Sequence, residues 1–358
     1  MIRELRIQNF KCFEDDTVHF GNITLLVGEN GTGKSSVIQS LLLLKQSDDS
    51  GQLRKGVLQL NGVLSHLGTA VDVLRGKSQS DTVVFDVSFE DGRKVAFRFK
   101  YPKGKPDDYF LHSKEHHLAF DHSLLYLSAE REGPRLTYPM SQQGGGTYDV
   151  GIHGEFSMST LSSNGHEPTP NRHLSRIADG TNQALLYQAN YWLQNIIGDV
   201  ECEVESIVKA DQVRIGIRAM NDSSFRRASN VGFGITYVLP IVVGALVSTQ
   251  GSILIVENPE AHLHPRGQSV IGYFLAHVAA SGVQVIVESH SDHVLNGMRK
   301  AVVDQVVEPN NVSIQFFITP KMDKDKRIIT INLDEKGRID KWPDGFFDQI
   351  TNDLEHLI

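Results

Sequence analysis

The alternation of apolar and polar positions predicts that the chain begins with a pair of short strands. Apolar side chains recur among polar ones at Ile2, Leu5, Ile7, Phe10, Phe13, Val18 and Phe20. This alternation is typical of half-buried strands, so we expect an edge hairpin. The continuous apolar run at 23–27 then predicts a buried strand, and the apolar residues of 37–45 predict a helix.

The same periodicities recur along the rest of the chain. The runs 83–89 and 94–99 flank an Asp-Gly turn and predict a second hairpin. An apolar stripe at helical spacing over 182–197 predicts a core helix, and 237–247 predicts an apolar one. Further strands are expected at 124–128, 202–208, 212–218, 251–257, 283–287, 313–318 and 327–332. Strands mixed with helices in this way place the chain in the α/β class.

Residues 101–180 are the least regular part of the sequence. Prolines and the run Gly144-Gly145-Gly146 interrupt them, and 142–172 is rich in Gly, Ser, Asn and His, which predicts a mobile loop or lid. Around this insertion we expect an N-terminal lobe at 1–100, a C-terminal lobe at 181–310 and a small tail at 311–358. Within the tail, a small core is expected from Trp342, Phe346 and Phe347.

Composition and charge narrow the class of protein. A length of 358 residues, with 40% hydrophobic and 22% charged residues, suits a globular protein with a large core. The net charge of −8 argues against a chain that binds nucleic acid because it is basic as a whole. No apolar run is long enough for a membrane span, and Met1–Ile7 is unlike a signal peptide, so we expect the cytoplasm. Cys12 and Cys202 lack partners at the spacing of a disulfide framework or a zinc finger.

The stretch from Gly28 to Ser36 is rich in glycine and lies between the buried strand and the helix, which is the pattern of a phosphate-binding loop. Backbone without side chains lets successive N–H groups surround a phosphate, and the N-terminus of the following helix favours an anion. The lysine of such a loop reaches the β- and γ-phosphates, and the serine after it meets Mg²⁺. The residues expected to bind nucleotide here are Asn30, Gly31, Thr32, Gly33, Lys34, Ser35 and Ser36, with Ser35 also a Mg²⁺ ligand.

A second group of polar residues ends the strand expected at 251–257. Glu257, Asn258 and Glu260 stand there in the manner of a Walker B site, where a rigid strand presents a carboxylate to Mg²⁺. The strand at 283–287 leads to His290. Although histidines recur in both stretches, a closed zinc site needs about four convergent ligands, and no cysteine is near, so zinc is not expected.

The strand expected at 124–128 ends in a charged turn that carries Arg131. An arginine at the end of a strand in an open α/β sheet is placed to reach a phosphate, a neighbouring subunit or a nucleic-acid backbone. A surface ion pair with Glu130 or Glu132 is the alternative. The sequence leaves both interpretations open.

The residues from Ile7 to Phe13, which read I-Q-N-F-K-C-F, give a resemblance when they are taken with the strand and the glycine-rich loop that follow. This arrangement resembles the head domains of the RecF, SMC and OLD-type ATPases, which are relatives of the ABC ATPases. The run W-P-D-G-F-F-D-Q from Trp342 to Gln349 is similar to the C-terminal signature of a family of bacterial ATPases with a domain of unknown function. The stretches from Asn230 to Gly234 and from Glu257 to Pro265 match that family too.

The resemblance implies roles for particular residues. Lys11 would contact a phosphate or ribose, and His290 would sense the γ-phosphate. The stretch 229–236 resembles the ABC signature motif, in which Asn230, Gly232 and Gly234 would contact nucleotide bound to the opposite subunit. These relatives carry a second carboxylate where this chain has Asn258. Because an amide cannot accept a proton from water, the base would be Glu260 or Glu257, and slow hydrolysis is predicted. A Mg²⁺-contacting loop is expected near Leu67-Gly68.

For the whole chain, the resemblance implies an ABC-ATPase head-like P-loop NTPase with a mixed central sheet, flanking helices and an irregular middle insertion. It implies ATP and Mg²⁺ as cofactors, and ATP would join two chains into a homodimer or a higher homo-oligomer. The favoured role is a sensor or regulator in bacterial anti-phage defence with a separate nuclease or toxin effector. The alternatives are a RecF- or SMC-like ATPase that binds duplex DNA in repair or maintenance, and a scaffold that hardly hydrolyses ATP. No membrane partner is expected.

Overall fold

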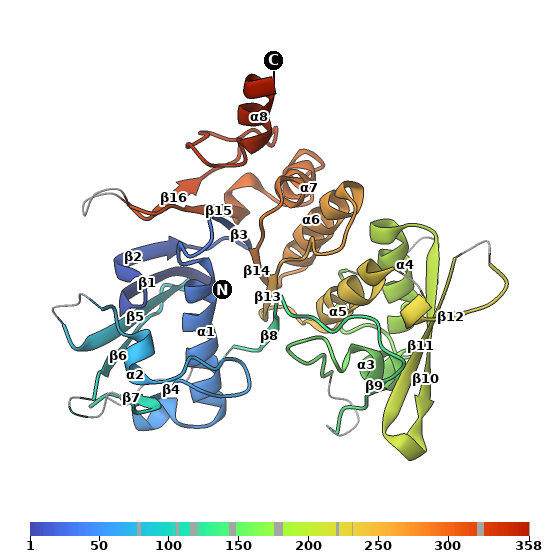
Figure 1. Cartoon of the computed structure of the whole chain (residues 1–358), viewed down its shortest axis with the longest axis horizontal. Coiled ribbons are helices and arrows are strands. Elements are labelled where there is room, and N and C mark those ends of the chain that lie inside the picture. Colours follow the sequence, from blue (N-terminus) through green and yellow to red (C-terminus); the bar gives the residue numbers. More distant parts are fainter. Residues whose placement is uncertain are drawn as a thin grey trace. The chain divides into compact units, whose positions relative to one another are not determined.

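The chain forms two compact units (Figure 1). The computed structural model describes residues 1–357 apart from 77–79, 103, 105–106, 115–119, 121, 143–147, 175–181, 220–221, 231 and 321–325. Unit 1 comprises Met1–Ser123, Pro309–Asp334 and Arg338–Ile358, and unit 2 comprises Leu124–Glu308 and Glu335–Gly337. These bounds differ from the four segments expected from the sequence, and that division stays a prediction.

The first sheet of unit 1 is antiparallel, with strand order β2-β1-β5-β6-β7-β4. Its strands are β1 (Ile2–Phe10), β2 (Phe13–His19), β4 (Val57–Gln59), β5 (Thr82–Phe89), β6 (Lys94–Lys100) and β7 (Phe110–His112). The alternating apolar residues of β1 face the core, and Phe10 stacks edge-on against Phe85 at 5.2 Å between ring centroids. Both hairpins expected from the sequence are confirmed, and β2 is the edge strand.

The remaining strands of unit 1 join the two ends of the chain. Strand β3 (Ile23–Gly28) pairs in parallel with β15 (Val312–Phe317), and β15 pairs antiparallel with β16 (Ile328–Ile331). Helix α1 (Lys34–Asp49) follows β3, as expected, and packs on β3 and β4. The smaller elements are η1 (Leu53–Lys55), α2 (Ala70–Val73), η4 (Pro309–Asn311) and α8 (Gln349–Leu357).

The expected small core of the tail forms around one residue. The Phe346 ring is buried and lies 5.3 Å from the Phe316 ring and 5.4 Å from the Trp342 ring, between centroids. Trp342, however, is 57% exposed, so it lies at the surface of this small core.

In unit 2, three parallel strands carry a nearly continuous apolar sequence. Strand β13 (Ile253–Glu257) lies between β8 (Leu124–Leu127) and β14 (Gln284–Glu288). Such runs are typical of strands covered on both faces. Helices α6 (Pro265–Ala280) and α7 (Asp292–Val303) follow β13 and β14 and lie side by side (Figure 1).

A second sheet of unit 2 contains β9 (Tyr138–Pro139), β10 (Val200–Ile207), β11 (Gln212–Ala219) and β12 (Arg226–Arg227), all antiparallel. Helices α3 (Ser157–Asn164) and α4 (Leu185–Ile197) both contact β10, and α5 (Phe233–Val247) contacts both helices. Two short turns, η2 (Val208–Ala210) and η3 (Ala228–Asn230), complete the unit.

Two sequence expectations for unit 2 are corrected. Helix α3 lies within the segment expected to be a loop, because its small polar residues are buried with Met158 and Leu161. Residues 143–147 of that segment lie outside the described residues. Helix α5 begins at Phe233, four residues before the expected start at 237. Ile235 and Thr236 of its first turn are buried, although the stretch reads as a glycine-rich loop.

The fold class expected from the sequence is confirmed. The chain has a mixed α/β fold in which a strand, a glycine-rich loop and a helix follow one another as in P-loop NTPases. Among the helices that the structure describes, none has the length and hydrophobicity needed to cross a membrane.

Candidate functional site

The glycine-rich loop of unit 1 has a backbone that requires glycine at two points. Gly28 has φ of 137°, and a Cβ there would lie 2.2 Å from the Phe317 carbonyl oxygen. Gly33 has φ of 119°, and its Cβ would meet the Cys12 sulfur at 2.8 Å. Any other residue would be strained at both positions. The Thr32 hydroxyl closes the loop by donating to the Glu29 carbonyl at 2.8 Å.

Lys34 and the start of α1 give this loop its positive electrostatic character. The Lys34 Nζ donates to the carbonyls of Gly28 at 2.9 Å and Glu29 at 2.7 Å, and the side chain is buried. Within the described residues, no side chain caps α1, and its first turn has no acidic residue. The first N–H groups of the helix and the exposed Ser35 therefore present donors and a positive helix end. This arrangement suits an anion such as a phosphate.

The turn between β1 and β2 lies against the same loop. The Cys12 thiol is half-buried and lies 3.8 Å from the Thr32 carbonyl oxygen. Lys11 has φ of 52° and donates from Nζ to the Gln39 Oε1 of α1 at 2.7 Å, and burial lowers the pKa of Lys11. Its expected contact with phosphate or ribose stays a prediction.

Arg327 also contacts the loop, which the sequence did not indicate. Its Nη1 donates to the Thr32 carbonyl at 3.3 Å, and its guanidinium carbon lies 6.0 Å from the Phe13 ring centroid. Arg327 comes from the segment just before β16, almost 300 positions after the loop. Sequence periodicity gives no signal for a contact of this kind.

In unit 2, the Glu257 carboxylate stands at the end of β13 between two donors. The Tyr126 hydroxyl donates to Oε1 at 3.1 Å, and the Ala129 N–H donates to Oε2 at 3.2 Å. Burial raises the pKa of Glu257, and these hydrogen bonds oppose that rise. The pKa of Tyr126 is raised strongly, first by burial and then by the Glu257 charge. Tyr126 is a site residue that the sequence analysis missed, because in the sequence it is one apolar-looking position of a strand.

Asn258 follows in a turn that is held from both sides. It has φ of 44°, and its N–H donates to the Glu288 carbonyl at 2.8 Å. Glu288, the last residue of β14, is the register partner of Glu257 and is only 7% exposed. Register partners on adjacent strands share a face, so two carboxylates end neighbouring strands on one side. The sequence analysis missed Glu288 as a site residue.

Glu260 joins the turn after β13 to the segment after β14. Its Oε1 accepts the His290 N–H at 2.8 Å, while its buried Oε2 has no hydrogen-bond partner among the described residues. The His290 side chain is exposed. The two carboxylates expected to activate water therefore lie at the end of β13 and in the turn that follows it. The backbone N–H of His290, the expected switch histidine, is bound to that turn.

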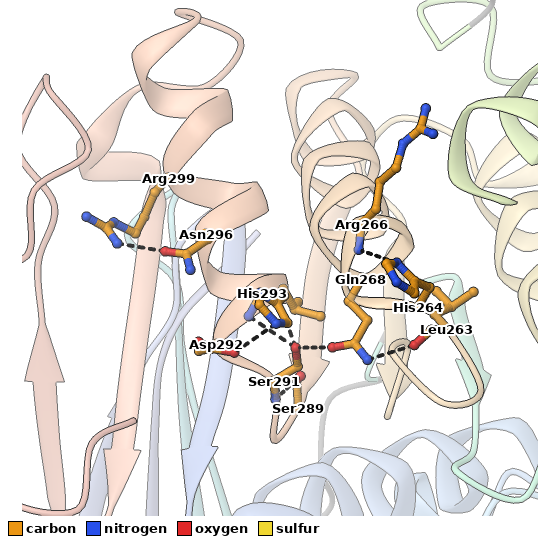
Figure 2. A network of polar contacts seen from close by, with 11 residues as sticks. Leu263, His264, Arg266, Gln268, Ser289, Ser291, Asp292, His293, Asn296 and Arg299 are labelled. Atoms are coloured by element: carbon orange, nitrogen blue, oxygen red, sulfur yellow. Dashed lines mark hydrogen bonds and ion pairs between the residues drawn. The ribbon is translucent and has the colours of Figure 1, made fainter. Parts of the chain in front are cut away.

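Figure 2 shows a further connection between these segments. The Ser291 hydroxyl donates to the Gln268 Oε1 at 2.6 Å, and the Gln268 Nε2 donates to the Leu263 carbonyl at 2.9 Å. The Ser291 oxygen also caps α7 by accepting the N–H groups of His293 and Val294. His264 caps α6 by accepting the Arg266 N–H at Nδ1, 3.3 Å away. His264 therefore has a structural role.

The start of α5 carries the residues expected to form the signature motif. Asn230 is exposed at the end of η3, and Gly232 is the N-cap residue of α5. A Cβ on Gly234 would lie 2.9 Å from the His262 carbonyl oxygen, so close packing explains that glycine. A Cβ on Gly232 would meet nothing within 4 Å, and its φ of −62° is ordinary. The fold therefore gives no reason for glycine at position 232.

Arg131 lies in neither of the expected situations. It is 4% exposed, and its guanidinium donates to the carbonyls of Ser128, Tyr237, Glu257 and Asn258. Burial lowers the pKa of Arg131 to about 10, so it stays charged at neutral pH. Both expectations for Arg131 are therefore wrong: it forms no surface ion pair with Glu130 or Glu132, and it does not point outward to a phosphate, a subunit or nucleic acid.

The structure therefore groups the predicted residues in two sets. Unit 1 holds the phosphate loop, with Asn30, Gly31, Thr32, Gly33, Lys34, Ser35, Ser36 and nearby Lys11. Unit 2 holds the carboxyl end of the parallel strands and the start of α5, with Glu257, Asn258, Glu260, His290, Asn230, Gly232 and Gly234. Within unit 2 the loop after β8 contacts Glu257, whereas Gly68 is bonded to Asn61 in unit 1. In the part of the chain that the structure describes, no group of three or more His, Cys, Asp or Glu side chains is placed to hold a metal ion.

A glycine-rich loop between a strand and an uncapped helix, with a carboxylate at the end of another parallel strand, defines a P-loop nucleotide-binding protein. The chain belongs to the family described as "AAA domain, putative AbiEii toxin, Type IV TA system", whose model matches residues 23–296. Residues 307–357 match a family described as "Protein of unknown function (DUF3696)". The resemblance to ATPases of the ABC, SMC and OLD type is confirmed.

Individual relatives match over short stretches. The chain is 54% identical over 43 residues to the DNA double-strand break repair Rad50 ATPase of Sulfolobus acidocaldarius, which covers 12% of this chain and 5% of that protein. It is 36% identical over 44 residues to the OLD nuclease of Thermus scotoductus, and this match covers 12% of this chain and 8% of that protein. The chain thus spans less than a tenth of either relative.

Solved SMC heads resemble the chain over most of its length. An SMC head bound to the C-winged helix domain of ScpA has a TM-score of 0.49 and 11% identity, covering 93% of this chain and 98% of that one. The SMC head domain from Thermotoga maritima has a TM-score of 0.44 and 12% identity, and the match covers 93% of this chain and 99% of that one.

Proposed function

We propose that the chain binds ATP with Mg²⁺, hydrolyses it slowly and dimerises around it. The observation that carries this proposal is the phosphate loop, where left-handed glycines, a buried lysine and an uncapped helix N-terminus converge. Lys34, which now donates to loop carbonyls, would turn to the phosphates. Ser35 and Glu257 would hold Mg²⁺, a hard ion that suits their oxygen ligands and would neutralise phosphate charge.

Slow turnover follows from the residues after Glu257. The Asn258 amide can orient a water molecule but cannot take its proton. Glu260 has one carboxylate oxygen bound to the His290 N–H and the other without a partner among the described residues, which makes it the candidate base. His290 would report the presence of the γ-phosphate through the same turn. Such a protein would spend most of its time with ATP bound, which suits a switch.

The biological role that we propose is regulation of a separate nuclease or toxin in anti-phage defence. The family description names a toxin of a toxin–antitoxin system, and one relative is named a nuclease, which supports a defence role. We favour this role over DNA repair or maintenance, in which duplex DNA would bind directly. The net charge of −8 also favours a protein partner over DNA.

The test of the ATPase is steady-state hydrolysis and equilibrium ATP binding by the full chain and two variants. We expect Lys34→Ala to lose ATP affinity by about a hundredfold, because it removes the cation that meets the phosphates. We expect Glu257→Gln to bind ATP but to lose turnover by about a hundredfold or more. Lys45→Ala is the matched control, since Lys45 lies on the same helix and, among the described residues, forms an ion pair only with Asp49. Normal hydrolysis by either site variant would contradict the assignment.

The same assay separates the proposed role from its alternative. Linear duplex DNA should leave the rate unchanged if the chain regulates a protein effector. Stimulation by DNA would favour the maintenance role instead. Cells that carry the chain with its neighbouring genes should resist phage, and Lys34→Ala should abolish that resistance.

A further inference from the structure

Arg131 carries a buried charge whose hydrogen-bond acceptors, among the described residues, are all backbone carbonyls in unit 2. Its Nε donates to Tyr237 at 3.1 Å, its Nη1 to Ser128 at 2.8 Å and Glu257 at 2.5 Å, and its Nη2 to Asn258 at 2.6 Å. A buried charge is costly unless it is compensated. Here the nearby carboxylates of Glu260 and Glu257 attract the guanidinium electrostatically. Because burial of this guanidinium is destabilising, we expect Arg131 to have a specific role at this position.

The acceptors belong to three different elements. Ser128 follows β8, Glu257 and Asn258 end β13 and begin its turn, and Tyr237 lies in the first turns of α5. A guanidinium is planar and offers five N–H groups in a fixed fork, so one side chain fixes the directions between these carbonyls. A lysine has no such fork and cannot hold four carbonyls in one plane.

Both segments that Arg131 connects, the turn after β13 and the first turns of α5, have an irregular backbone. Asn258 is in the left-handed region, with its N–H bound to the Glu288 carbonyl and its own carbonyl bound to Arg131. In α5, Pro240 has no N–H to donate to the Thr236 carbonyl, so the helix lacks one internal hydrogen bond there. The neighbouring Tyr237 carbonyl accepts its hydrogen bond from Arg131, outside the helix.

We propose that Arg131 is a positioning residue that joins the first turns of α5 to the turn after Glu257, so that the two segments move together. This inference rests on the proposed function, because ATP hydrolysis is the activity that a connection between these segments would control. A displacement at Asn230 and Gly232, where a second chain's nucleotide is expected, would reach Glu257 and Asn258 through Arg131. Arg131 would thereby couple dimer formation to the activation of water.

The test compares Arg131→Lys and Arg131→Ala with wild type, and Arg135→Ala is the control. Arg135 lies in the same segment but is exposed and pairs only with Glu132 among the described side chains. Amide hydrogen exchange is measured without nucleotide on peptides that cover 233–239 and 256–262. We expect both sets of amides to exchange about tenfold faster in both Arg131 variants, while the amides of α1 stay unchanged.

Kinetics supply the readout that a merely structural role would not give. We expect kcat to fall at least about tenfold in Arg131→Lys while the ATP affinity stays within about twofold. Guanidinium ion at millimolar concentration should restore part of the rate to Arg131→Ala but not to Glu257→Gln. If Arg131→Ala does not fold, Arg131→Lys retains the charge and decides the question.

The outcomes are distinguishable from failure of the proposed function. Unchanged exchange in either peptide set would overturn the inference, whatever the ATPase rate. A parallel loss of ATP affinity, melting temperature and kcat would reduce Arg131 to general stability and also overturn it. If wild type fails to hydrolyse ATP, the proposed function fails, and the exchange experiment still decides whether Arg131 joins the two segments.

Discussion

Asn258 shows how backbone conformation constrains a chemical position. With φ of 44° it lies in a region that asparagine and aspartate tolerate and longer side chains avoid. The sequence presents this residue as a missing carboxylate, whereas the structure adds that the turn itself selects a short polar side chain. The neighbouring acids, Glu257, Glu260 and Glu288, all lie on ordinary strand or turn backbone and are free of that restriction.

We predict that Asn258→Asp speeds ATP turnover about tenfold, because it supplies a proton acceptor beside Glu257 without changing the backbone. Asn258→Glu should cost about 1 kcal/mol of unfolding free energy, because its side chain disfavours this φ. Asn258→Gly keeps the turn and lacks the acid, so it is the control and should not be faster. Steady-state rates and urea unfolding measure both effects. An Asp variant no faster than wild type would show that a missing base does not limit the rate.

Tyr126 gives a prediction about pH. Its hydroxyl donates to the ionised Glu257 carboxylate and thereby lowers a pKa that burial has raised above the ordinary 4.5. Tyr126→Phe removes that donor, so the pKa rises further and less carboxylate is ionised at a given pH. We therefore expect the acid limb of the ATPase pH profile to move upward by about half a unit to one unit.

The same shift has a consequence for stability. Because the folded pKa lies above the unfolded one, the folded chain holds this proton more tightly, and stability falls as pH rises through the window above 4.5. Tyr126→Phe should widen that window and destabilise the fold more at pH 7 than at pH 4. Tyr187→Phe, at an exposed position on α4, is the control for both measurements. An acid limb at the wild-type position would remove Tyr126 from the site.

At the scale of elements, helices α6 and α7 approach closely because each has a glycine at the point where the two helices cross. A Cβ on Gly297 would lie 2.0 Å from the Ser269 carbonyl oxygen, and one on Gly272 would lie 2.1 Å from that of Val294. Backbone atoms cannot give way as a side-chain tip can. This contact fixes the helices that follow β13 and β14, and Gln268 and Ser291 connect the same helices at their N-terminal ends (Figure 2).

We predict that Gly297→Ala destabilises the chain by about 3 kcal/mol or more, because the helices must separate to admit the methyl group. That loss exceeds the roughly 1 kcal/mol that alanine gains over glycine in a helix interior. Urea unfolding followed by circular dichroism measures it. Gly232→Ala is the control, because it adds the same methyl group in open space. Equal stability of the two variants would mean that the helices do not pack as closely as described.

The elements predictable from the sequence are those with local signals. Alternation gave β1, β2, β5 and β6, and the glycine-rich loop with its flanking apolar runs gave β3 and α1. Helix α3 escaped prediction because buried serines and threonines carry it, and burial of polar residues depends on partners elsewhere. Arg131 was misinterpreted for the same reason, since three of its acceptors lie more than a hundred residues away. Neighbouring glutamates suggested a surface pair that the fold does not make.

At the scale of the whole molecule, the chemistry is divided between the two compact units. Unit 1 carries the phosphate loop, and unit 2 carries the acids of β13 and β14 with the start of α5. A ligand stabilises whichever state binds it best, so a nucleotide contacted by two chains would stabilise their dimer. In our proposal a second chain contributes the start of its α5 to the nucleotide, so ATP would act as part of the dimer interface.

The behaviour of Gly232 tests that arrangement. Its φ of −62°, and the absence of described atoms within 4 Å of an added Cβ, mean that alanine fits the single chain without strain, unlike at Gly234. If Gly232 is kept small for close approach of a nucleotide bound to another chain, Gly232→Ala should weaken ATP-dependent dimerisation by about tenfold or more and leave the melting temperature unchanged. Sedimentation with ATP, in a Glu257→Gln background that retains the nucleotide, measures the dimer. Gly76→Ala, where a Cβ also meets nothing within 4 Å, is the matched control. Equal dimerisation of both variants would show that the start of α5 does not face the partner's nucleotide, and a different surface would have to join the two chains.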